Sequence, residues 1–145
     1  MNKKEASTLQ INGGYELHTF DDLRELYSNY IFNANDKKSI EEAYDFIINK
    51  HKDQTRRSGE PYYHHLIETA YIVASLHAGP TTIIAALLHD VVEDTDVPIE
   101  EIEKRWGSEV AQLVDSLTKI QRLKLSKIDA VEFEAEDHRK IFIGM

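Results

Sequence analysis

Apolar residues recur at steps of three and four along most of this chain, which is the spacing of amphipathic helices. No stretch alternates between apolar and polar residues over a sustained length, so strands are not predicted. The first 18 residues carry no clear period and are interpreted as a loose arm, and the polar segment 121–129 as a mobile connection. The pattern predicts an all-α fold with helices at about 20–31, 38–51, 61–77, 81–95, 98–106, 108–117 and 132–145.

Turn-forming residues set the predicted limits of the central helices. Pro61 suits the start of the third helix, because proline is favoured in a first helical turn. Gly79-Pro80 is expected to end that helix with a left-handed C-cap. Thr81 or Thr82 would then cap the start of the next helix.

The composition is that of one soluble domain large enough to bury its own core. Its 145 residues include no cysteine, which excludes disulfides and leaves His, Asp, Glu and water to hold any metal. No apolar run approaches the ~18–20 residues that span a bilayer, and the polar start MNKKEAST is not a secretory signal, so a cytoplasmic location is expected. The net charge of −9 argues against nucleic-acid binding, although the basic segment 50–57 can still attract a small anion.

The segment 81–95, TTIIAALLHDVVEDT, concentrates candidate chemistry at the end of one predicted helix. His89 lies one turn before Glu93 and Asp90 one turn before Asp94, so this helix end carries an imidazole and three carboxylates. A His-Asp pair on a helix is more often structural, but crowded carboxylates repel one another unless a cation or protons neutralise them. The added carboxylates therefore favour a buried divalent metal, and imidazole with carboxylate suits Mn, Fe or Zn.

A second element must contribute ligands, because neighbours on one helix cannot surround an ion. His64 and His65 in the first turn of the preceding helix are the candidates, with one binding metal while the other packs or faces solvent. Arg56, Arg57 and Ser58 stand just before them. Composition alone favours a solvated basic loop here, but arginines beside a metal suit the cleavage of a phosphoester or pyrophosphate.

These motifs resemble a known enzyme family. The spacing of His65 and His89-Asp90 is similar to the start of the HD-superfamily phosphohydrolase signature. The strings RRSGEPYYHH, AALLHDVVEDTD and WGSEVAQLVDSLTKI resemble the hydrolase domain of the RelA/SpoT family, which makes and degrades guanosine tetra- and pentaphosphate alarmones (ppGpp and pppGpp). The resemblance covers about residues 20–145, after a flexible arm at 1–19, and implies a compact helical HD-domain fold with a Mn²⁺ ion.

The resemblance also implies a reaction and a site. The reaction is hydrolysis of the alarmone 3′-pyrophosphate, which gives GDP or GTP plus pyrophosphate. The matching positions fall into metal ligands, an acidic pair that activates the attacking water, and a loop that holds the guanine nucleotide. These are respectively His65, His89 and Asp90; Glu93 and Asp94; and Arg56, Arg57 and Ser58.

The chain departs from the family pattern in two places. The usual His-Pro is His65-Leu66 here, which alters a helix-favouring residue rather than a chemical group. The family's fourth metal ligand, an aspartate followed by an asparagine, would come after Met145. The expectation is therefore an HD domain truncated at its C-terminus, with weakened metal binding, marginal stability and reduced activity. The alternatives are an HD phosphohydrolase of another nucleotide and a non-catalytic helical module that binds a nucleotide or a partner.

Overall fold

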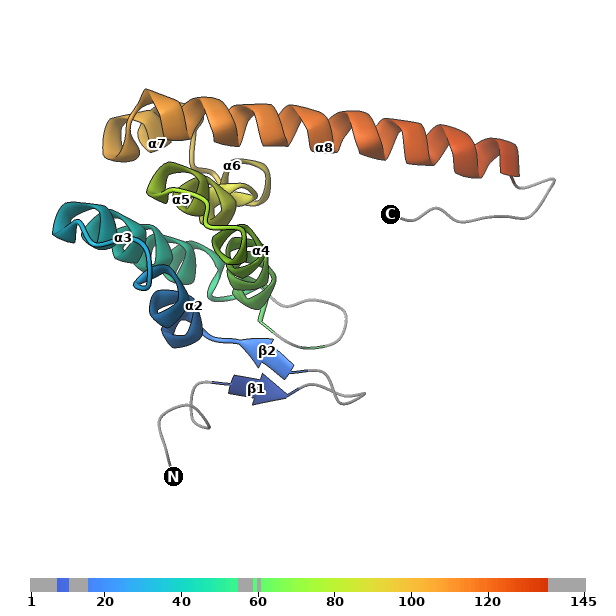
Figure 1. Cartoon of the computed structure of the whole chain (residues 1–145). Coiled ribbons are helices and arrows are strands. Elements are labelled where there is room, and N and C mark those ends of the chain that lie inside the picture. The colour runs from blue at the N-terminus through green and yellow to red at the C-terminus, as the bar shows by residue number, and fades with distance from the viewer. Residues whose placement is uncertain (1–7, 11–15, 55–58, 60, 136–145) are drawn as a thin grey trace.

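The computed structural model describes residues 8–10, 16–54, 59 and 61–135 and is predominantly helical (Figure 1), which confirms the predicted fold class. None of the helices in this part of the chain is both long and apolar enough to cross a membrane. A short hairpin comes first and seven helices follow in the described residues. The elements are β1 (Thr8–Gln10), β2 (Glu16–His18), α2 (Phe20–Tyr27), α3 (Ala34–His51), α4 (Tyr63–Ser75), α5 (Pro80–Leu88), α6 (Val91–Asp94), α7 (Ile99–Trp106) and α8 (Ser108–Ala135).

Helix α5 is the centre of the domain. It lies between α3 and α4 on one side and α8 on the other, and it contacts all three (Figure 1). Its residues 83–88 are all buried, so neighbours cover this helix on every side rather than along one stripe. Each fully buried leucine or isoleucine contributes roughly 1.5–3 kcal/mol relative to its exposed state. The core therefore holds the C-terminal end of α5 in a fixed position.

The prediction of one continuous helix over 81–95 is wrong. Helix α5 ends at Leu88, His89 and Asp90 form a turn, and the one-turn helix α6 begins at Val91. At this break the carbonyl oxygen of Ala86 accepts a hydrogen bond from the His89 ring at 2.6 Å. In an uninterrupted helix the same carbonyl would accept the amide N–H four residues later. The side chain competes with the backbone for this acceptor, which favours the end of α5 at this point.

Helix α5 also begins earlier than predicted. Gly79 is its N-cap and Pro80 its first residue, so neither Thr81 nor Thr82 caps it. Proline at the first helical position has φ preset for the helix, and its missing N–H would have no partner within the helix in any case. The proline therefore starts this helix, whereas α4 has already ended at Ser75.

The left-handed residue after α4 is His77, with φ of 62°, whereas Gly79 has an extended φ of −74°. The predicted left-handed cap at Gly79 is therefore wrong. Tyr30 stabilises the turn from the side, because its ring stacks on His77 at 4.5 Å and its hydroxyl donates to the Ala78 carbonyl at 2.8 Å. A tertiary contact thus supports a backbone conformation that local sequence would assign to glycine.

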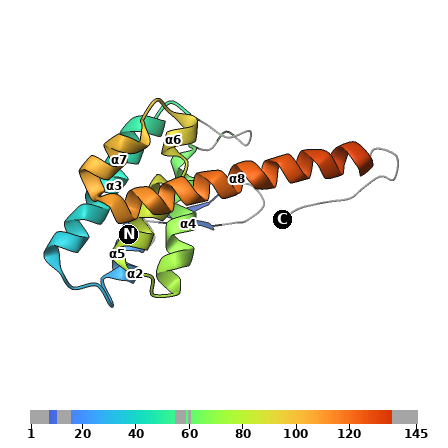
Figure 2. The ribbon, with the colours of Figure 1, turned by 90° about the horizontal axis from the view of Figure 1, so that it is seen from above.

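Helix α8 runs without interruption from Ser108 to Ala135 and extends well beyond the other helices (Figure 2). The predicted connection at 121–129 and the predicted new helix start at 132 are therefore wrong. The segment 121–129 is polar, but it lacks glycine and proline and consists largely of lysine, arginine, glutamine and leucine, which favour helices. Residues 136–145 of the predicted last helix lie outside the described residues.

The N-terminal segment contains two short antiparallel strands where the sequence predicted no regular structure. Leu9 pairs with Leu17, and Thr8 with His18. The hairpin is attached to α4, because the His18 ring stacks on Tyr71 at 3.6 Å and its Nδ1 lies 3.1 Å from the Glu68 carboxylate. The strands are too short to show the alternation that identifies a strand from sequence. The flexibility of the arm as a whole stays a prediction.

Candidate metal centre

Three side chains, one from the start of α4 and two from the turn between α5 and α6, meet at the C-terminal end of α5. His65 lies in the first turn of α4, and His89 and Asp90 form the turn between α5 and α6. His65 Nε2 lies 3.7 Å from Asp90 Oδ2, and His89 Nε2 lies 3.3 Å from Asp90 Oδ1. One potential ligand atom from each residue lies within 4.8 Å of the other two. This arrangement allows the three side chains to bind one ion.

The backbone fixes the tautomer of His89. Its ring is buried, and Nδ1 lies 2.6 Å from the carbonyl oxygen of Ala86. Because a carbonyl oxygen only accepts, Nδ1 carries the proton, and in the neutral ring the lone pair is on Nε2. A ligating histidine commonly donates its second ring N–H to a carbonyl in this way, which orients the ring. His89 is thus prepared to bind a cation through Nε2.

Asp90 is held by a tyrosine that precedes α4. The Asp90 side chain is buried, and its Oδ2 accepts a hydrogen bond from the Tyr62 hydroxyl at 2.7 Å. Burial and this contact, with a smaller contribution from Asp94, raise the pKa of the Tyr62 hydroxyl well above its usual value. The hydroxyl therefore stays protonated and remains a donor to the carboxylate at any physiological pH.

The two adjacent histidines of α4 have different surroundings. His65 belongs to the cluster with Asp90, and its side chain is 35% exposed, so the site reaches solvent on this side. His64 is buried and packs edge-on against the Tyr63 ring, with ring centres 4.7 Å apart. Of the two residues left open by the sequence, the structure brings His65 to the cluster.

The acidic pair Glu93 and Asp94 lies on α6, directly after the His89-Asp90 turn, and both side chains are exposed. The Asp94 carboxylate lies close enough to the Tyr62 hydroxyl to contribute to its raised pKa. Asp94 is therefore next to the hydroxyl that contacts Asp90. The catalytic role of both acids stays a prediction.

The predicted nucleotide-binding residues Arg56, Arg57 and Ser58 lie outside the described residues. The two ends of their loop are fixed, because the Tyr62 amide donates to the Gln54 carbonyl at 3.0 Å. The Gln54 side chain in turn donates from Nε2 to the backbone oxygen of Asp94 at 3.2 Å. The described residues on either side of this segment, Gln54 and Tyr62, therefore lie beside the acidic pair.

Sequence reasoning missed Tyr62, Gln54 and His51 as neighbours of this cluster. His51, to which no functional role was assigned from the sequence, is fully buried and stacks on Tyr62, with ring centres 5.3 Å apart and planes at 24°. Its Nδ1 lies 3.1 Å from the Gln54 side-chain oxygen. The position of Tyr62 three residues before His65 is a weak signal, but its bond to Asp90 spans 28 residues and has no local signature.

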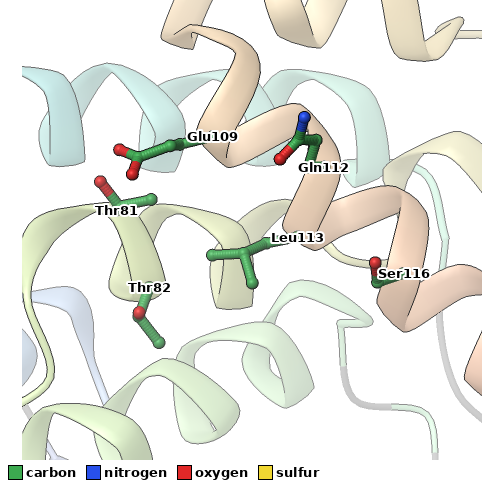
Figure 3. Close-up of a pocket in the computed structure, with 6 residues that line it drawn as sticks. All are labelled: Thr81, Thr82, Glu109, Gln112, Leu113 and Ser116. Carbon is green, nitrogen blue, oxygen red and sulfur yellow. The ribbon is translucent and has the colours of Figure 1, made fainter.

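A pocket of about 450 Å³ lies at the opposite end of α5 (Figure 3). Because α5 has 9 residues, about 13 Å of helix separates its two ends. The pocket contains no histidine, and its single carboxylate disfavours anions. The pocket is therefore separate from the cluster of His65, His89 and Asp90. Its lining residues are Thr81, Thr82, Glu109, Gln112, Leu113 and Ser116.

The donor set at the α5 end fits a divalent metal. It combines one buried carboxylate with two imidazoles, of which His89 has its tautomer fixed with Nε2 toward Asp90. Imidazole and carboxylate together suit Mn, Fe, Zn and similar ions. Three protein ligands leave coordination positions for water and substrate, as in catalytic rather than structural metal sites.

Comparison with known proteins assigns the fold and the motif to a family. Residues 43–145 match the HD domain family. The chain is 41% identical over 129 residues to a guanosine-3′,5′-bis(diphosphate) 3′-pyrophosphohydrolase of Aquifex aeolicus, which covers 89% of this chain and 17% of the relative. It is 36% identical to the bifunctional (p)ppGpp synthase/hydrolase SpoT of Escherichia coli K12, over 89% of this chain and 18% of that protein.

A solved structure, of a metazoan ortholog of SpoT that hydrolyses ppGpp, superimposes with a TM-score of 0.55 at 32% identity. The similarity covers 61% of this chain and 56% of that one. The chain spans less than a fifth of the length of the bacterial relatives, at 17% and 18%. The family match over residues 43–145 includes all three residues of the cluster. This chain belongs to the HD domain family.

Proposed function

We propose that this chain hydrolyses the 3′-pyrophosphate of guanosine tetraphosphate or pentaphosphate, with Mn²⁺ held by His65, His89 and Asp90. The products are GDP or GTP and pyrophosphate. One observation carries the proposal: the buried Asp90 carboxylate lies between two imidazole Nε2 atoms, at 3.3 and 3.7 Å. The names of the relatives give the substrate class, because the chain is 41% identical over 129 residues to a protein named for this reaction.

In the proposed reaction a water oxygen forms a bond to the phosphorus attached to the ribose 3′ oxygen. The bond between that phosphorus and the 3′ oxygen breaks, and the 3′ oxygen leaves with a proton. A divalent metal held by these residues would lower the pKa of a bound water and offset the negative charge of the pyrophosphate. Glu93 or Asp94 orients the water and accepts its proton. Both side chains are exposed, so an accepted proton can pass on to solvent.

Substrate binding is assigned to Arg56, Arg57 and Ser58. Guanidinium groups bind phosphate through paired hydrogen bonds and stack on planar bases. The ends of their loop support this role, because the Gln54–Tyr62 backbone bond returns the chain to Asp90 and Asp94.

The test is product analysis of the purified chain with guanosine tetraphosphate, in parallel reactions with Mn²⁺, Mg²⁺, Zn²⁺ or EDTA. Release of GDP and pyrophosphate that depends on Mn²⁺ and is lost in Asp90→Asn supports the proposal. Asp115→Asn is the matched control, because Asp115 lies on α8 and forms an i,i+4 pair with Lys119. The Aquifex aeolicus relative serves as the positive control for the assay.

Three other outcomes select different functions. Nucleotide binding without turnover would support a non-catalytic nucleotide-binding module. Faster hydrolysis of another nucleotide, such as dGTP or ATP, would identify an HD phosphohydrolase of different specificity. Turnover that is unchanged in Asp90→Asn would overturn the assignment of the metal site itself.

A further inference from the structure

One side chain outside the ligand set contacts the centre directly. The Tyr62 hydroxyl donates to Asp90 Oδ2 at 2.7 Å, while Asp90 Oδ1 faces His89 Nε2 at 3.3 Å. The last torsion of an aspartate is broad, so an unsupported carboxylate samples many orientations. The hydrogen bond to Oδ2 fixes the rotation of the carboxylate, so that Oδ1 faces His89 Nε2 while His65 Nε2 lies 3.7 Å from Oδ2. Tyr62 therefore sets the orientation of the Asp90 carboxylate.

Tyr62 is itself held in place on three sides. Its amide donates to the Gln54 carbonyl at 3.0 Å, and its ring stacks on the fully buried His51 ring with centres 5.3 Å apart. The edge of the same ring meets the His65 ring, with centres 5.9 Å apart and planes at 61°. Tyr62 thus contacts both a carboxylate and an imidazole of the cluster. A residue fixed by backbone, stacking and hydrogen bonding is suited to orienting its neighbours.

We propose that Tyr62 is a positioning residue for the metal centre, whose hydroxyl occupies Asp90 Oδ2 and leaves Oδ1 as the oxygen that binds the ion. The inference rests on the metal site of the proposed function and does not depend on the substrate. Removing the hydroxyl frees Oδ2, so the carboxylate rotates and the ligand geometry is no longer preset. Partners of this kind, one step removed from the metal, change metal affinity by about 10- to 100-fold when mutated.

The test compares metal affinity with stability of the metal-free protein. Mn²⁺ binding to the chain is titrated calorimetrically for the unaltered protein, Tyr62→Phe, Asp90→Asn and Tyr63→Phe. Tyr63 is the matched control, because it is the neighbouring tyrosine and packs against His64 rather than the cluster. Unfolding temperatures of all four proteins are measured in EDTA, where a merely structural role of Tyr62 would be visible.

The expected result is a Mn²⁺ affinity lowered about tenfold or more in Tyr62→Phe, with a nearly unchanged unfolding temperature in EDTA. Tyr63→Phe should bind like the unaltered chain. Equal affinity of Tyr62→Phe and the unaltered chain would overturn the inference while leaving the metal site intact. Absence of binding to the unaltered chain would instead overturn the metal site of the proposed function, and the inference with it.

A second measurement uses the unaltered protein and remains decisive if Tyr62→Phe does not fold. In a crystal structure with Mn²⁺ bound, the Tyr62 hydroxyl is expected to stay within hydrogen-bond distance of Asp90 Oδ2, with Oδ1 on the metal. A metal bound to Oδ2, with the tyrosine displaced from the carboxylate, would contradict the inference.

Discussion

His89 donates a hydrogen bond from its ring Nδ1 to the carbonyl oxygen of Ala86, three residues earlier, at 2.6 Å. Because Nδ1 carries the proton in this bond, the lone pair of the neutral ring is on Nε2, which faces Asp90. One hydrogen bond thus favours the end of a helix and orients a ligand. The break between α5 and α6, which the sequence did not predict, therefore contributes to the geometry of the site.

Replacing His89 by alanine should remove one of three ligands. Since loss of an outer partner alone costs about 10- to 100-fold in metal affinity, loss of the ligand should cost at least about 100-fold. Calorimetric titration with Mn²⁺ measures the change. His77→Ala is the control histidine, because His77 lies in the turn after α4 and is exposed. A nearly unchanged affinity in His89→Ala would remove this residue from the ligand set.

Removing the metal should destabilise the folded chain. A ligand that binds only the native state adds about 2.7 kcal/mol at a concentration of 100 times its dissociation constant. EDTA should therefore lower the unfolding temperature relative to saturating Mn²⁺, and the shift should vanish in Asp90→Asn. The unfolding temperatures of the unaltered chain and of Asp90→Asn are measured by circular dichroism, with Mn²⁺ and with EDTA. The prediction fails if Mn²⁺ stabilises Asp90→Asn as much as the unaltered chain.

The acidic pair should affect turnover more than metal binding. Glu93→Gln and Asp94→Asn keep the size of the side chain and remove its charge, and neither residue belongs to the three-residue cluster. Loss of a general base typically lowers the rate by about 10²- to 10⁴-fold. Rates with guanosine tetraphosphate and Mn²⁺ affinities are measured on the same samples. Asp96→Asn, which alters an exposed acid two residues later, is the control and should retain both properties.

If Glu93→Gln or Asp94→Asn lowers metal affinity and rate by the same factor, that acid acts through the metal site rather than on the water. If only one variant is slow, the assignment narrows to that residue. Asp94 contributes to the raised pKa of the Tyr62 hydroxyl, which donates to Asp90, so Asp94 is the acid for which a partial effect on metal binding is expected.

Most of the fold was predictable because steps of three and four between apolar residues identify most of the helices. The residues alone left His64 and His65 as alternatives, and the resemblance to a family selected His65, which the structure places beside His89 and Asp90. The end of α5 was not predictable, because a buried helix is apolar on all sides and its pattern continues past Leu88. Tyr62 was missed for another reason: its partner is 28 residues away.

The predicted connection at 121–129, which is helical in α8, is wrong because a polar composition is not evidence against a helix. A polar composition at 121–129 was interpreted as a connection, although the segment contains no residue that ends a helix. Composition reports exposure, and a helix that extends beyond the other helices is expected to be polar there (Figure 2). Exposure and loss of helical structure are separate properties, and only the first could be inferred from these residues.

Alkaline pH should destabilise the chain through Tyr27. Burial, with a further contribution from the Glu41 carboxylate, raises the pKa of the Tyr27 hydroxyl to about 12, against about 10 in an unfolded chain. Below pH ~10 both states keep the proton and stability is unaffected. Between these values only the unfolded state loses its proton, so stability falls as pH rises and the contribution is lost through pH ~12.

The Tyr27→Phe variant removes this titration. Its free energy of unfolding in urea should fall less between about pH 9 and about pH 11.5 than that of the unaltered chain, by about 1–2 kcal/mol. The variant has no hydroxyl to ionise at this position in either state. Parallel pH dependence of the two proteins would show that Tyr27 does not control the alkaline transition.

The burial of α5 should make it the most sensitive element to truncation of a side chain. Leu87 has no exposed surface and lies two residues before His89, so Leu87→Ala leaves a cavity at the centre of the domain. The expected loss is about 2–5 kcal/mol in the free energy of unfolding, measured with urea in EDTA. Leu123→Ala on α8 removes the same atoms from a side chain that is 64% exposed and should change stability by less than about 0.5 kcal/mol. Equal losses in the two variants would mean that α8 is covered in solution and that α5 is not the centre of the core. A large loss in Leu87→Ala alone, accompanied by weaker Mn²⁺ binding, would show that the packing of α5 also fixes the position of its metal ligands.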